Sequence, residues 1–309
     1  MIPLAALLLP LLLWDRGPET ADQLRRAQIR QIAVPVNLAE TWKATKDISA
    51  VPVDPNRLTT LPPPSLTFNA QVSSATRAPW VNQNGWRFLR QPGGSYLYET
   101  KGEGAVLAAV EAFAYGVRAY VRTDDTGLAS FGRVLTFLSS LPDGNMSPEV
   151  NIGFVDDGST ESGEFMNLLV RRNLLFKVVQ QPDPKLDLNV ALGQGDYPRA
   201  EAGNPKLLAE KVRAHLTDEK RLLRIYGSEV VIGRLLRDRN AARLLLINYG
   251  AAKSPVHGLR IRVLGSYPKL HAVQYGNAPC RLTDVLTGPD ATEFTLPELG
   301  TFATIDLGH

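Results

Sequence analysis

The segment Val150–Val179, VNIGFVDDGSTESGEFMNLLVRRNLLFKVV, constrains the fold more than any other part of the sequence. An apolar run at 151–155 predicts a strand, and apolar residues at helical spacing predict a helix over 162–172. A second apolar run at 174–179 predicts another strand. Strand, helix and strand in this order form a βα unit of a parallel sheet, so we expect an α/β layer here.

The same alternation precedes this segment. Apolar runs predict strands at 11–14, 32–36 and 117–121, and helical periodicity predicts helices near 20–28, 103–115 and 126–140. Gly116 suits the left-handed position that follows a helix. A proline-rich connection over 47–79 interrupts the pattern, and we expect one short strand within it, near 66–68.

After residue 222 the pattern becomes all-β. Short apolar runs separated by turn residues predict strands at 230–236, 242–249, 258–264, 270–274, 282–285, 293–296 and 301–307. The turn 237–240, RDRN, lies between the first two and predicts a hairpin. Just before this region, Asn204 followed by Pro205 predicts a helix start. Many short strands in succession favour an antiparallel β-sandwich.

The composition excludes several classes of function. The net charge is +3 and the basic residues are dispersed, so no nucleic-acid surface is expected. Cys280 is the single cysteine of the 309 residues, which excludes an intrachain disulfide and a cysteine-based zinc site. The histidines lack metal-ligand spacing, and no nucleotide-binding or nucleophile-elbow motif occurs. We therefore expect no cofactor and no metal.

The first thirteen residues, MIPLAALLLPLLL, are almost wholly apolar. The run is shorter than the ~20 residues of a membrane span but fits the ~7–15 residues of a signal-peptide core. We therefore expect a periplasmic or secreted protein with no stable membrane span. The run lacks a preceding Lys or Arg and a following A-x-A-like site. The alternative is that Leu11–Trp14 is a buried first strand of a cytoplasmic protein.

Two segments near the C-terminus point to a known architecture. These are Leu244–Gly250, LLLINYG, and Thr292–Ile305, TEFTLPELGTFATI. Both resemble the terminal β domains of multidomain glycoside hydrolases of the β-galactosidase type. In that family a TIM barrel precedes an amidotransferase-like α/β layer and then a small β domain. The resemblance covers residues 150 to 309 by the order of the parts.

This resemblance implies a fold class of α/β followed by all-β. Residues 14–148 would form a shortened barrel-like α/β region, because a full (β/α)8 barrel needs at least ~200 residues. Residues 149–228 would form a small flavodoxin- or amidotransferase-like α/β domain, and 229–309 the C-terminal antiparallel β-sandwich.

Acidic residues follow two predicted strands. Asp156 and Asp157 come after the strand at 151–155, and Asp15 follows the strand at 11–14. Because α/β proteins bind ligands at the carboxyl ends of their strands, these carboxylates are candidate catalytic groups of a glycosidase. Trp14 would stack on a sugar ring. The alternative is that Asp156 and Asp157 form a turn and cap the next helix, and that Trp14 is buried beside an Asp–Arg pair.

An aromatic and polar segment supplies candidate ligand-binding residues. Aromatic rings suit the faces of sugars, and amide and guanidinium groups suit their hydroxyls. The candidates are Arg77, Trp80, Asn82, Trp86 and Arg87. The same composition also suits a loop that packs over the edge of the barrel-like region.

These features favour a carbohydrate-associated, extracytoplasmic protein of glycoside-hydrolase-like architecture that binds a sugar without cleaving it. One alternative is an active glycosidase that uses paired carboxylates. Another is a structural or assembly protein with no small-molecule ligand, whose sandwich forms an oligomer interface.

Overall fold

The computed structural model describes residues 8–68, 79–142, 146–276 and 280–309. The chain divides into two compact units, and each is discontinuous in sequence. Unit 1 comprises residues 1–65 and 91–144, and unit 2 comprises residues 66–90 and 145–309. The boundaries that the sequence predicts, near 148 and 228, stay predictions.

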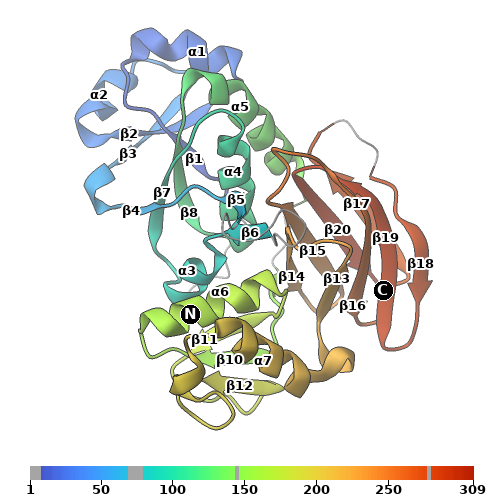
Figure 1. Ribbon diagram of the computed structural model, residues 1–309. Helices are drawn as coiled ribbons and strands as arrows, with labels where there is room; N and C mark the ends of the chain where they lie inside the picture. Colours follow the sequence, from blue (N-terminus) through green and yellow to red (C-terminus); the bar gives the residue numbers. More distant parts are fainter. Residues whose placement is uncertain (1–7, 69–78, 143–145, 277–279) are drawn as a thin grey trace. The chain divides into compact units, whose positions relative to one another are not determined.

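Unit 1 is built on a six-stranded sheet in which every neighbouring pair is parallel (Figure 1). The strands, in their order across the sheet, are β3 (Ser49–Val53), β2 (Gln31–Pro35), β1 (Leu11–Leu13), β8 (Arg118–Arg122), β7 (Ser95–Glu99) and β4 (Thr59–Leu61). The two edge strands, β3 and β4, lie in the proline-rich connection. The strand predicted near 66–68 is present as β5 (Ser65–Phe68). The further strands β3 and β4 were not predicted, because an edge strand tolerates a proline such as Pro52.

β1 lies at the centre of this sheet. Leu12 pairs with Ile32 of β2 and with Val121 of β8, and its side chain is fully buried. Residues 11–13 are therefore part of the hydrophobic core of unit 1. Where the protein resides in the cell stays a prediction.

The helices of unit 1 are α1 (Ala21–Arg26), α2 (Ala39–Trp42), α4 (Gly104–Tyr115) and α5 (Asp125–Ser140), with short 3-10 turns at Pro18–Thr20, Val36–Leu38 and Pro55–Arg57. α4 is apolar on nearly every face, and its residues from Ala105 to Ala114 are all buried. Gly116 ends it in the left-handed conformation, with φ at 61°, as the sequence predicts.

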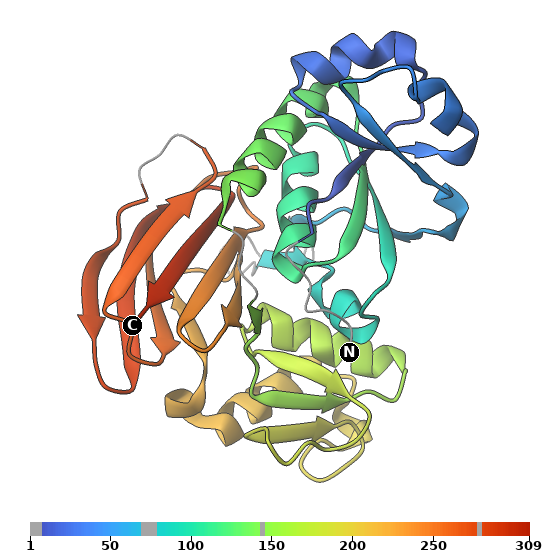
Figure 2. The same ribbon diagram turned by 180° about the vertical axis from the view of Figure 1, so that it is seen from behind.

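Unit 2 contains a small α/β layer. Its parallel sheet has the order β11 (Phe176–Val179), β10 (Ile152–Val155), β12 (Leu188–Ala191). α6 (Thr160–Arg171) and α7 (Pro205–Lys220) pack against each other on one face of this sheet (Figures 1 and 2). A short 3-10 turn, Arg199–Glu201, precedes α7. Asn204 caps α7 through its side chain and Pro205 is its first residue, which confirms the predicted helix start.

The aromatic segment belongs to unit 2. β5 (Ser65–Phe68) and β6 (Pro79–Asn82) form a two-stranded sheet, and α3 (Gly85–Arg90) follows. The buried Gln83 donates a hydrogen bond through Nε2 to Oδ1 of Asn167 in α6, at 2.7 Å. This segment therefore packs on the α/β layer of unit 2.

The rest of unit 2 is a sandwich of two antiparallel sheets, which confirms the predicted change of pattern after residue 222. One sheet has the order β13 (Leu223–Tyr226), β16 (Val256–Leu264), β19 (Ala291–Leu299), β18 (Thr283–Thr287). The other has the order β17 (Lys269–Gln274), β20 (Phe302–Gly308), β15 (Ala241–Asn248), β14 (Val231–Arg237), β9 (Ser147–Pro148).

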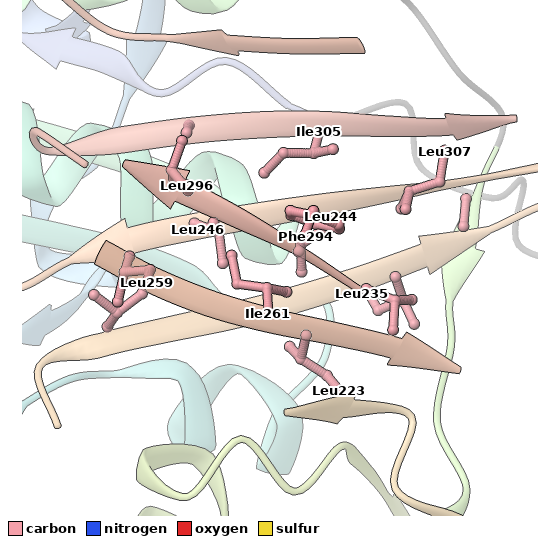
Figure 3. Packing of buried hydrophobic residues seen from close by; sticks show 14 of the residues in the cluster. Leu223, Leu235, Leu244, Leu246, Leu259, Ile261, Phe294, Leu296, Ile305 and Leu307 are labelled. Atoms are coloured by element: carbon pink, nitrogen blue, oxygen red, sulfur yellow. The ribbon is translucent and has the colours of Figure 1, made fainter. Parts of the chain in front are cut away.

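The core of the sandwich lies between these two sheets. Figure 3 shows Leu244, Leu246 and Ile305 of one sheet interleaved with Leu259, Phe294 and other apolar residues of the opposite sheet. Such alternating inward side chains stabilise a sandwich through the hydrophobic effect. Among the described residues, no helix has the length and apolar character required to cross a bilayer.

Candidate functional site

Asp15 lies at the carboxyl end of the unit 1 sheet, where the sequence places it. The Nε of Arg122, at the end of β8, is 3.6 Å from Asp15 Oδ2, and the same guanidinium pairs with Glu99 at the end of β7. Both carboxylates are about half exposed. Glu99 was missed by the sequence reasoning, which did not predict the strand that carries it.

Trp14 is buried beside this edge. It is 3% exposed, and its indole N–H donates to the hydroxyl of Thr20 at 2.9 Å. The Thr20 hydroxyl donates in turn to the carbonyl of Gly17 at 2.6 Å. The ring therefore stabilises the turn before α1 and offers no open face to a sugar.

Asp156 connects two segments of unit 2. Arg90 of α3 donates to both of its carboxylate oxygens, at 2.8 and 2.7 Å, and also to the carbonyl of Ser159. Both side chains are mostly buried. A bidentate arginine–carboxylate pair fixes geometry as well as charge, so Asp156 holds α3 against the turn before α6.

Asp157 is used within the same turn. Its Oδ1 accepts from the Ser159 amide at 3.0 Å, from the Ser159 hydroxyl at 2.6 Å and from the Ser162 hydroxyl at 2.7 Å, and its Oδ2 pairs with Arg199. Burial alone would raise the pKa of this carboxyl, but the hydrogen bonds outweigh it and hold the pKa well below its usual range.

The N-cap of α6 is Ser159, whose hydroxyl accepts from the Ser162 amide at 3.2 Å. Asp157 accepts hydrogen bonds from the Ser159 and Ser162 hydroxyls and so stabilises that cap, but it is not itself the N-cap. In this conformation the contacts of Asp156 and Asp157 match the turn-and-cap interpretation of the acidic segment.

The members of the aromatic segment occupy different environments. Arg77 lies outside the described residues. Asn82 donates to the hydroxyl of Thr67 at 3.4 Å, and Arg87 donates to Oδ1 of Asn84 at 3.1 Å. These two side chains lie within the segment's own hydrogen-bond network.

Trp86 packs against α6. A β-carbon at Gly163 would lie 2.9 Å from the Trp86 ring, so the absence of a side chain there is what admits the indole. The guanidinium groups of Arg87 and Arg90 lie over the ring, at 4.3 and 5.5 Å from its centroid. Trp86 is therefore a packing residue between α3 and α6.

Trp80 is more accessible. Its side chain is 40% exposed, and the guanidinium of Arg171 lies 3.8 Å from the ring centroid. Arg171 also donates to the carbonyl of Pro79 at 3.2 Å, which holds the stacked pair together. The ring borders a pocket of about 430 Å³, which we call the Trp80 pocket.

The Trp80 pocket is strongly cationic. It is bordered by the end of α6, one side of α7 and the segment from the end of α7 through β13 to residue 229. Its basic lining residues are Arg171, Arg172, Lys206, Arg213, Arg221 and Arg224. Sequence reasoning missed this group because its members come from three separate stretches of chain. The doublet at 171–172 was the one local signal.

A second hollow of unit 2, of about 300 Å³, lies at the ends of β10 and β12. The hydroxyl of Tyr197 and Nδ1 of His215 are 2.9 Å apart there, and Nε2 of His215 is 3.5 Å from Asp196 Oδ2. Burial raises the pKa of Tyr197 to about 12. The chain changes direction across the sheet at this point, which is where open α/β sheets hold ligands.

Burial raises the pKa of the Cys280 thiol to about 11, which favours its protonated form at neutral pH. Within the described ranges, no three His, Cys, Asp or Glu side chains gather closely enough to hold a metal ion.

Comparison by sequence finds no matching protein-family model and no matching curated protein. Comparison by structure finds similar folds among glycoside hydrolases. An alpha-L-fucosidase isoenzyme 2 from Paenibacillus thiaminolyticus superposes with a TM-score of 0.54 at 8% identity, over 70% of this chain and 61% of the fucosidase chain. The present chain thus spans less than two thirds of that enzyme.

Two β-galactosidases give weaker superpositions. The enzyme from Rahnella sp. R3 has a TM-score of 0.43 at 9% identity, over 90% of this chain and 63% of its own. A GH42 β-galactosidase from G. stearothermophilus has a TM-score of 0.36 at 7% identity, over 97% of this chain and 60% of its own. The fucosidase superposition shows a weak likeness of fold to a glycoside hydrolase.

Proposed function

We propose that the protein binds carbohydrate in the Trp80 pocket and does not cleave it there. The observation that carries this proposal is the position of Trp80, whose half-open ring borders a pocket of about 430 Å³. Pockets that take small ligands have volumes of roughly 300–1,000 Å³. An exposed indole gives the apolar face of a pyranose ring a flat contact surface, and polar groups around it orient the hydroxyls.

Binding is favoured over cleavage by the groups around the pocket. Glycosidases of the common types need two carboxyl groups about 5–9.5 Å apart. Among the described residues that line the Trp80 pocket, Glu229 is the single carboxylate. The remaining polar groups are cationic or neutral, and they can bind the hydroxyl groups of a sugar without cleaving it.

The glycoside-hydrolase-like fold is consistent with a carbohydrate ligand. The same proposal includes a β-galactosidase-type order of the parts, which the C-terminal segments support. It also includes an extracytoplasmic location, which the apolar N-terminal run supports. An oligomer interface on the sandwich stays a prediction.

A second candidate is glycosidase activity at the unit 1 edge. It is favoured by Asp15 and Glu99, which contact one guanidinium, that of Arg122. Two carboxylates that share a guanidinium lie within the upper limit of about 9.5 Å for a glycosidase pair. A hydrolysis assay on Asp15→Asn and Glu99→Gln tests this candidate separately.

The test of the proposed function is a glycan-array screen followed by calorimetric titration of the best ligand, with product analysis for cleavage. Trp80→Ala should weaken binding more than about tenfold, since it removes the stacking surface, and Trp80→Phe should restore part of it. Phe68→Ala is the matched control, because Phe68 is similarly exposed in unit 2 and does not line the pocket. Glycan binding that Trp80→Ala leaves unchanged would refute the proposed site.

A further inference from the structure

We propose that the carbohydrate taken by the Trp80 pocket is acidic and carries carboxylate or sulfate groups. This inference rests on the proposed function and adds the charge of the ligand to it. Its basis is the charge of the pocket. Six cationic side chains line it, and Glu229 is the one carboxylate among its described lining residues.

The cations come together from distant parts of the chain. Arg171 and Arg172 stand at the end of α6, Lys206 and Arg213 on α7, and Arg221 and Arg224 in the segment that leads into β13. Like charges on neighbouring elements repel one another. A fold that gathers six of them around one hollow is stabilised when an anion binds there.

The carboxylates nearby do not neutralise this group. Asp218 is shared by three guanidiniums, those of Arg213, Arg221 and Arg224, at 3.7, 3.5 and 3.0 Å. Lys206 meets Glu210 at 4.0 Å. Glu164 and Glu229 also act on Arg171, and Glu219 acts on Arg224, but of these three only Glu229 lines the pocket. The pocket wall itself therefore carries six cations and one carboxylate.

Part of this charge is desolvated. Arg221 is 8% exposed. Its pKa is lowered mainly by burial and secondly by the positive charge of the neighbouring Arg213. Burial and the charge of Arg172 also lower the pKa of Arg171. The Nε atoms of Arg171, Arg221 and Arg224 are buried and have no hydrogen-bond partner among the described residues. Burying a charge without a full set of partners is costly, so a bound anion would offset a cost that the empty pocket carries.

Two chemistries meet in the pocket. Guanidinium groups bind carboxylate and sulfate oxygens through paired N–H donors, and Trp80 contributes an apolar surface for a sugar ring. A free inorganic anion would satisfy the arginines but would gain nothing from the indole. A neutral sugar would use the indole and leave the arginines unpaired. An acidic sugar uses both.

The experiment is calorimetric titration with five probes. These are an oligogalacturonate, its methyl ester of the same length, a sulfated galacto-oligosaccharide, and inorganic phosphate and sulfate. The ester is the matched control, because esterification removes the charge and keeps the sugar. We expect at least one acidic oligosaccharide to bind about tenfold or more tightly than its neutral counterpart at 50 mM NaCl. The preference should fall about fivefold or more at 500 mM NaCl, where charges are screened over about 4 Å.

The following variants distinguish loss of the pocket's positive charge from loss of folding. Arg172 and Arg213 are exposed on the rim, so the double substitution Arg172→Gln with Arg213→Gln should fold normally and lose about tenfold in affinity for the acidic probe. Arg224→Gln removes a less exposed cation and should also fold normally and lose about tenfold in affinity for the acidic probe. Arg239→Gln is the control, because Arg239 is exposed on the β14–β15 hairpin and does not line the pocket. Circular dichroism confirms that each variant is folded.

The outcomes distinguish this inference from the proposed function. Equal affinity for the acid and its methyl ester, with loss in Trp80→Ala, would refute the acidic ligand and leave carbohydrate binding standing. Binding of inorganic anions without any oligosaccharide would refute both the sugar and the inference as stated. Absence of binding by all five probes would overturn the acidic ligand, whereas the glycan array decides the proposed function separately. A preference for the acidic probe that Arg239→Gln abolishes as fully as the pocket variants would also contradict the inference.

Discussion

At the residue scale, two tryptophans six positions apart have different environments. Trp86 contacts α6 at Gly163, whereas Trp80 borders a pocket with Arg171 over its ring. The sequence marks both as candidates, because composition cannot tell a packed indole from an open one. The difference comes from α6, which follows some eighty residues later and contacts both rings through its own side chains.

Trp86→Ala should therefore reduce stability and Trp80→Ala should not. The loss at position 86 should approach the about 3–5 kcal/mol of buried aromatic truncations, reduced by its partial exposure. Urea unfolding measures both. Equal midpoints for the two variants would contradict the packing role of Trp86.

Asp157 provides a pH-dependent prediction. Its pKa in the folded protein lies below the unfolded value of about 3.9, so its stabilisation is complete above that pH and is lost as the pH falls through the folded pKa. Asp157→Asn should cost about 1–2 kcal/mol at pH 7, and the gap to the wild type should narrow below pH ~4. Urea unfolding at pH 7, 5 and 3.5 measures this gap. Asp290→Asn, at an exposed position, is the control, and a gap that stays constant with pH would count against this role.

At the element scale, one residue links the α/β layer of unit 2 to its sandwich. Asn173 follows α6 with φ at 54°. Its Oδ1 accepts from the Gly233 amide at 2.7 Å, and its Nδ2 donates to the Val231 carbonyl at 3.2 Å. An asparagine tolerates this left-handed backbone and satisfies two buried groups of β14.

Substitutions at Asn173 should rank by these two effects. Asn173→Ala should be the most destabilising, by about 2–4 kcal/mol, because it loses both hydrogen bonds and strains the backbone. Asn173→Gly loses the same two hydrogen bonds but tolerates the left-handed backbone. It should therefore be about 1 kcal/mol less destabilising than Asn173→Ala. Equal stability of the Ala and Gly variants in urea would show that the backbone carries no strain.

β1 is the element on which the sheet of unit 1 depends. Removing residues 1–13 deletes the strand between β2 and β8, whereas removing residues 1–7 leaves it. We expect the longer truncation to abolish the cooperative unfolding of unit 1 and the shorter one to preserve it. Circular dichroism with urea titration distinguishes them. A stable protein that begins at Trp14 would contradict the position of β1.

Much of the local structure could be predicted from the sequence. The helix predicted at 126–140 is α5, the strands predicted at 230–236 and 242–249 are β14 and β15, and Asp238 stabilises the turn between them by accepting from the amides of Asn240 and Ala241. These features depend on periodicity and on short-range hydrogen bonds. The cationic pocket depends on contacts between α6, α7 and β13, which no local pattern encodes.

At the scale of the whole molecule, each unit is discontinuous in sequence. The chain passes from unit 1 to unit 2 at 65–66, returns at 90–91 and crosses again at 144–145. The segment 66–90 belongs to unit 2 because of contacts such as the Arg90–Asp156 pair and the Trp80–Arg171 stack. A linear division of the sequence could not place it there.

A crystal structure of the full chain with the tightest-binding oligosaccharide tests acidic-sugar binding in the Trp80 pocket directly. We predict a sugar ring over Trp80, with an acidic group within hydrogen-bond distance of the pocket arginines, Arg224 among them. Ligand density at another place, such as the hollow beside Tyr197 and His215 or the edge at Asp15 and Glu99, with the Trp80 pocket empty, would contradict this prediction.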